Sequence, residues 1–175
     1  MKIEFKVLSM MELRNSPGEM LDRVSKDGEV FVVERNGQPK ACLVPVSFLM
    51  PDIPSARISE EIERLDKEGQ PRKIIINESK EIEFSFHEVV AGENVFMSII
   101  LPHGYPINAP KIFVEPIPKN TPSRWGDGSI QCFGKMDIWN AKKHNVFSTL
   151  LLGRRWLKEY TVWKTTGKWP NPGEE

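Results

Sequence analysis

The chain has 175 residues, enough for one domain or for two small ones. Its 24 basic side chains balance its 24 acidic ones, which excludes a general attraction to nucleic acid or to anionic membranes, so any DNA contact must come from a local cluster. No apolar run reaches the ~18 residues of a membrane helix, and the first residues lack the apolar core of a signal peptide. We therefore expect a cytoplasmic protein with no membrane partner.

A strand and a helix are predicted at the start of the chain. Residues 2–8 alternate polar and apolar side chains, as a half-buried strand does. Ser16 is a predicted N-cap, Pro17 the first helical residue and Glu19 the third, which together make a capping box. The helix is expected to end at Asp27-Gly28.

A β-hairpin is predicted after this helix. Two β-rich apolar runs, at 30–34 and 40–47, flank Asn36-Gly37, a dipeptide typical of tight hairpin turns. Cys42 lies within the second run and is therefore predicted to be a core residue. The first part of the chain thus has the order strand, helix, hairpin.

Residues 1–49 resemble the Phd/YefM antitoxins. The motifs that carry the resemblance are Glu12-Leu13-Arg14, Val24-Ser25-Lys26-Asp27-Gly28 and Arg35-Asn36-Gly37-Gln38-Pro39. The resemblance implies a homodimer that binds operator DNA, represses its own operon and neutralises a toxin through a following segment. It also implies that Arg14 and Arg35 face DNA, and Asn15, next to a helix N-terminus, can add a phosphate contact. From the residues alone, both arginines also fit ordinary solvated side chains.

A second domain is predicted after a proline-rich linker at 50–56. Residues 57–67 have the apolar spacing of an amphipathic helix. β-Prone segments follow at 73–77, 82–87, 94–101 and 111–115. After an irregular loop, 147–165 forms a long helix with one apolar stripe, made of Leu152, Trp156, Tyr160 and Trp163. Helix, antiparallel meander, loop and helix predict an α+β domain over 57–175.

This second domain resembles the ubiquitin-conjugating enzymes, in particular divergent bacterial members. The matching segments are the strand and turn at 96–106, the following 109–114, Trp139-Asn140 and the closing stretch 166–170. The resemblance implies a UBC-like fold, an antiparallel meander flanked by helices. It also implies a cysteine that carries ubiquitin, or a ubiquitin-like protein, as a thioester.

Cys132 is the candidate for that cysteine, because a thiolate is a strong nucleophile and a good leaving group. The family pattern has the cysteine one position earlier, and here Gln131 intervenes, which in an extended segment turns the side chain to the opposite face. The family's oxyanion-stabilising asparagine has only a loose substitute, Asn120, and His144 is a histidine that can approach in the fold. A buried cysteine without chemistry is the alternative. The residues predict no metal site and no cofactor.

Two functions fit these observations. The first is an antitoxin-like, DNA-binding autorepressor of a toxin–antitoxin module, in which the UBC-like domain binds a toxin or another protein. The alternative is a bacterial ubiquitin-conjugating-like enzyme with a thioester on Cys132, in which the first domain serves dimerisation or targeting. A third possibility gives both domains only scaffolding roles.

Overall fold

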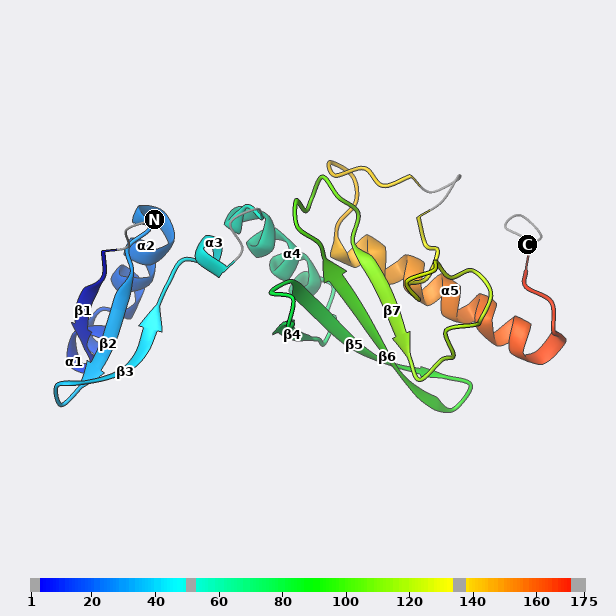
Figure 1. Cartoon of the computed structure of the whole chain (residues 1–175), viewed down its shortest axis with the longest axis horizontal. Coiled ribbons are helices and arrows are strands. Elements are labelled where there is room, and N and C mark those ends of the chain that lie inside the picture. The colour runs from blue at the N-terminus through cyan, green and yellow to red at the C-terminus, as the bar shows by residue number, and fades with distance from the viewer. Residues whose placement is uncertain (1–3, 50–52, 134–137, 171–175) are drawn as a thin grey trace. The chain divides into compact units, whose positions relative to one another are not determined.

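A computed structural model of the chain describes residues 4–49, 53–133 and 138–170. The chain divides into two compact units, Met1–Pro51 and Asp52–Glu175, each with its own sheet (Figure 1). Within the described ranges, no helix is both long and apolar enough to span a membrane. We describe the two units separately.

The first unit is a three-stranded sheet with short helices. The elements are β1 (Lys6–Ser9), α1 (Met10–Asn15), α2 (Pro17–Asp27), β2 (Phe31–Arg35), β3 (Gln38–Leu43) and α3 (Val46–Leu49). β2 is central, parallel to β1 and antiparallel to β3. The predicted helix and hairpin are present, although the second hairpin strand ends at Leu43 instead of residue 47. Of the strand predicted at 2–8, residues 2 and 3 lie outside the described ranges and β1 begins at Lys6. The helices α1 and α3 are additional.

The capping box of the first unit lies seven residues before its predicted position. Ser9 caps α1: its hydroxyl accepts from the N–H of Glu12 at 3.2 Å, and its own N–H donates to the Glu12 carboxylate at 2.9 Å. Ser16 makes no such side-chain bond, so the capping box predicted there is wrong. The physical reason is that Ser16 also ends α1, donating its N–H to the Glu12 carbonyl, which holds its backbone away from the usual N-cap conformation.

Cys42 is exposed, which corrects its prediction as a core residue. The core of the first unit consists of Leu8, Met20, Val24, Phe31 and Val33. Cys42 is in register with Val32, and neighbours on a strand point to opposite faces, so Cys42 lies on the face opposite to Phe31 and Val33. β3 is also an edge strand, so only one of its two sides pairs with a neighbouring strand in the described sheet.

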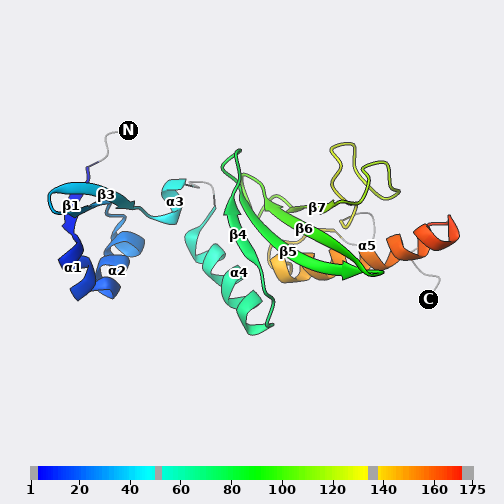
Figure 2. The ribbon, with the colours of Figure 1, turned by 90° about the horizontal axis from the view of Figure 1, so that it is seen from below.

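The second unit is an antiparallel α+β structure, as predicted. Its elements are α4 (Ser55–Lys67), β4 (Lys73–Ile76), β5 (Ile82–Val90), β6 (Glu93–Leu101), β7 (Lys111–Glu115) and α5 (Val146–Thr166). The strands pair antiparallel in chain order, and α5 crosses one face of the sheet (Figure 2). The four predicted strands and the two predicted helices are confirmed within a few residues.

The core of the second unit lies between the sheet and α5. Alternate residues of β5 and β6 are fully buried, among them Phe84, Met97 and Ile99. Gly153 of α5 allows the helix to approach closely, because a Cβ atom there would lie 2.5 Å from the sulfur of Met97. This packing fixes the start of β7 and the segment that follows it, where the candidate site lies.

Candidate functional site

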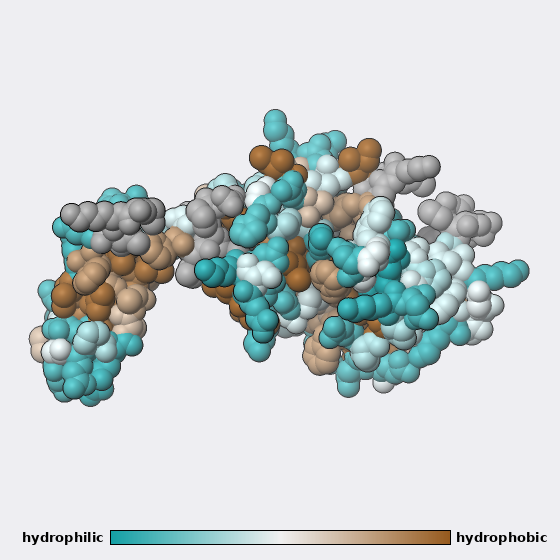
Figure 3. Space-filling view, viewed as in Figure 1, coloured by the Kyte–Doolittle hydropathy of each residue, from teal (hydrophilic) through white to brown (hydrophobic). Residues whose placement is uncertain are grey.

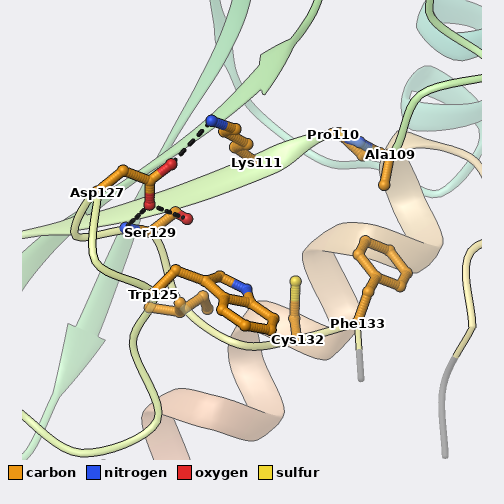
Figure 4. Close-up of a pocket in the computed structure, with 9 residues that line it drawn as sticks. Ala109, Pro110, Lys111, Trp125, Asp127, Ser129, Cys132 and Phe133 are labelled. Carbon is orange, nitrogen blue, oxygen red and sulfur yellow. Dashed lines mark hydrogen bonds and ion pairs between the residues drawn. The ribbon is translucent and has the colours of Figure 1, made fainter. Parts of the chain in front are cut away.

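A cavity of about 340 Å³ lies beside the start of β7 in the second unit (Figure 4). One wall comes from the turn into β7 and the other from the segment between Trp125 and Phe133. The lining residues are Ala109, Pro110, Lys111, Trp125, Asp127, Ser129, Ile130, Cys132 and Phe133. Cys132, predicted as the nucleophile, is therefore part of a cavity wall.

Arg124 fixes the loop that carries this wall. Its guanidinium donates to the carbonyls of Gly128 at 2.5 Å, Ile117 at 3.1 Å and Val114 at 3.3 Å, and it lies 5.1 Å from the centre of the Trp156 ring. Burial lowers the pKa of Arg124. The loop thus has a rigid base and holds the cavity side chains in place.

The Cys132 side chain is only 6% exposed, and its sulfur is directed toward the cavity with Trp125 and Phe133 on either side (Figure 4). The backbone turns locally, since the N–H of Cys132 donates to the Ile130 carbonyl at 3.0 Å. Gln131 is exposed, and its own N–H is bound to Ser123 at 2.8 Å. The additional residue in the motif therefore does not turn the thiol away from the cavity.

An ion pair lines the same cavity. The Lys111 ammonium lies 2.8 Å from the Asp127 carboxylate, whose other oxygen accepts from the hydroxyl of Ser129 at 2.6 Å and from its N–H at 3.0 Å (Figure 4). The bond from Lys111 and those from Ser129 hold the pKa of Asp127 well below its usual range. Asp127 in turn raises the pKa of Lys111. The cavity therefore contains one cation and one anion that neutralise each other.

The other two candidates of this domain do not line the cavity. Asn120 lies in an exposed turn and is absent from the cavity wall. His144 accepts from the N–H of Asn140 at its Nδ1 (3.0 Å), and its ring packs 6.0 Å from Phe133 and 5.6 Å from Trp139. His144 thus supports the Phe133 side of the cavity from behind, and the structure does not bring Asn120 to Cys132.

The predicted DNA-binding residues are exposed on the first unit. Arg14 and Asn15 lie in the last turn of α1, and Arg35 ends β2. Within the described part of the chain, neither arginine forms an ion pair. Asn15 lines a cavity of about 400 Å³ together with Glu12 and Arg23.

Sequence reasoning did not single out Lys111, Trp125 and Asp127. One signal in the sequence could have indicated Asp127. The dipeptide Asp127-Gly128 is typical of a turn and stands shortly before Cys132, and a turn can bring the side chains on its two sides together. Among the residues that the structure describes, no three His, Cys, Asp or Glu side chains are grouped so that they could hold a metal ion.

Comparisons with known proteins give little beyond this geometry. No family model and no curated protein matches the chain. Among solved structures, the chain is similar to a Vps23 UEV in a complex with ubiquitin, with a TM-score of 0.43 and 13% identity. That match covers 73% of this chain and 91% of the other.

Proposed function

We propose that the second unit is a ubiquitin-conjugating-like domain that carries the C-terminus of a ubiquitin-like protein as a thioester on Cys132. The observation that carries this proposal is the Cys132 sulfur, which is largely buried but is directed toward a cavity of about 340 Å³. A thiol on a cavity wall can be reached by a substrate group that enters the cavity, which a thiol enclosed on all sides by core side chains cannot.

The cavity contains the groups that such chemistry requires. In the loading step the Cys132 sulfur attacks the carbonyl carbon of a donor thioester, a new C–S bond forms, and the donor's thiolate leaves. Two donors line the cavity and can stabilise the transient oxyanion, the Trp125 indole N–H and the Lys111 ammonium. Within the described residues the indole N–H has no hydrogen-bond acceptor, so it is available to a ligand.

A loading assay tests this function. The full chain is incubated with ubiquitin bearing a C-terminal mercaptoethanesulfonate thioester, and separately with the same thioester of N-acetylglycine. We expect an adduct on the peptide that contains Cys132, removed by hydroxylamine and by excess thiol, as a thioester is. Absence of an adduct on Cys132 with either donor would overturn the proposal.

A second candidate function concerns the first unit, and we propose it as an operator-binding, dimeric domain. Arg14 and Arg35 are exposed and lack ion-pair partners in the described chain, so both guanidinium groups are available for phosphate. The unit also exposes apolar surface (Figure 3), and its exposed apolar side chains include Phe5, Val7, Met11 and Leu21. Such surface favours contact with a second copy.

Replacing Arg14 and Arg35 together by alanine is expected to weaken binding to the DNA upstream of the gene by about tenfold or more at low salt. Each lost phosphate contact should also reduce the salt dependence of log Kd by about one. Gel-shift titrations at several salt concentrations measure both quantities. Arg64→Ala, an exposed arginine of the other unit, is the matched control. A wild-type chain that binds no upstream DNA would remove this candidate.

A further inference from the structure

The Lys111–Asp127 ion pair shares its cavity with the Cys132 thiol and needs an explanation of its own. A lysine amine is the group that a thioester acylates, and Lys111 lies on the wall of the cavity in which the thioester would form. A thioester on Cys132 would therefore have a competing acceptor within its own chain. Self-acylation at that position would consume the loaded protein and block the cavity.

The geometry around Lys111 opposes that reaction. A lysine attacks a carbonyl only as the neutral amine, and the ion pair at 2.8 Å stabilises the ammonium form. Asp127 is the main cause of the raised pKa of Lys111, with Glu81 adding to it. The hydroxyl and N–H of Ser129 hold the Asp127 carboxylate in position, so the ammonium has a fixed partner.

We propose that Asp127 protects Lys111 from acylation by the Cys132 thioester, so that the acyl group is reserved for an external amine. This inference rests on the proposed function. In the suppressed reaction, the neutral Lys111 nitrogen attacks the thioester carbonyl, a C–N amide bond forms and the C–S bond breaks. Cys132 leaves as the thiolate, and the nitrogen loses one proton to it or to water.

Asp127→Asn tests the inference in the full chain. The asparagine side-chain oxygen can still accept from Ser129, so the substitution removes mainly the charge that faces Lys111. The chain is loaded with the mercaptoethanesulfonate thioester of N-acetylglycine, and peptide mass spectrometry measures acylation of Lys111 as a fraction of chains loaded on Cys132. Lys119, which lies outside this cavity, is the internal reference for acylation directly from solution.

In Asp127→Asn we expect Lys111 acylation per loaded chain to rise clearly above wild type, because loss of the Asp127 charge lowers the pKa of Lys111 and so raises its neutral fraction. Adding Cys132→Ala to that variant should reduce Lys111 acylation, now measured per total chain, to the level of Lys119. Equal Lys111 acylation in wild type and Asp127→Asn, with Cys132 loaded in both, would overturn the inference alone. A Lys111 signal that survives Cys132→Ala would also overturn it. Failure of Cys132 to load in any variant would overturn the proposed function and this inference together.

Discussion

Two single-cysteine chains are expected to load at very different rates, with the less exposed thiol reacting faster. The chain has two cysteines, so Cys42→Ser leaves only Cys132 and Cys132→Ala leaves only Cys42. Cys132 is 6% exposed and faces a cavity, whereas Cys42 is exposed on an edge strand. With the ubiquitin thioester as donor, we expect the Cys132-only chain to load at least about tenfold faster, because a positioned nucleophile gains from orientation that a surface thiol lacks.

Accessibility alone predicts the opposite order, which makes the comparison decisive. An unreactive buried thiol would load more slowly than Cys42, since exposure and thiolate fraction govern ordinary thiols. The initial rate of hydroxylamine-sensitive adduct, followed by intact mass, measures the difference. Circular dichroism of both chains controls for folding. If the Cys42-only chain loads as fast or faster, Cys132 is not a nucleophile of the proposed kind.

The predictable part of the fold is the part set by local periodicity. The run 111–115 alternates apolar and polar side chains, and the structure has β7 at those residues. The prediction of a capping box at Ser16 was wrong because the sequence has two Ser-x-x-Glu patterns, one at Ser9 and one at Ser16. Only the tertiary structure selects between them. The prediction that Cys42 is a core residue was wrong because an apolar run does not reveal which of its side chains point to the core face of the sheet.

Of the candidate site, the sequence allowed us to predict Cys132 but not the ion pair beside it. Cys132 could be named because its residue type carries the chemistry. Lys111 and Asp127 each read as ordinary surface charges, and they meet because a loop held by Arg124 returns the chain to the start of β7. A contact between residues on different segments leaves no periodic signal in one sequence. Asn120 illustrates the converse, since its nearness to the motif in sequence does not place it on the cavity wall.

A buried carboxylate, Glu61, joins α4 to the start of α5 and supports the aromatic side of the cavity. It is 1% exposed and accepts the hydroxyl of Tyr105 and the N–H of Val146, the latter at 2.7 Å. The Arg57 Nε lies 2.8 Å from it as an ion-pair partner. Burial, and next the Glu61 charge, raise the pKa of Tyr105, which keeps its hydroxyl protonated and donating. Val146 begins α5, so the carboxylate also faces the positive end of that helix.

Replacing Glu61 by alanine is therefore expected to destabilise the second unit by about 3–5 kcal/mol, the cost of breaking a buried ion pair and leaving its partners unpaired. Glu60→Ala is the matched control on the same helix. Its side chain is 67% exposed and its carboxylate lies 3.7 Å from Arg57, so the substitution should lower the free energy of unfolding by at most about 1 kcal/mol. All five tryptophans lie in the second unit, so their fluorescence in urea titrations of the full chain reports the unfolding of that unit alone. If the two variants unfold at the same urea concentration, Glu61 is not the anchor of α5. The expected result is that only Glu61→Ala lowers the urea concentration of unfolding and that the loading of Cys132 falls in the same variant. In that case the aromatic contacts from Tyr105 through Trp139 to Phe133 hold the cavity wall in place.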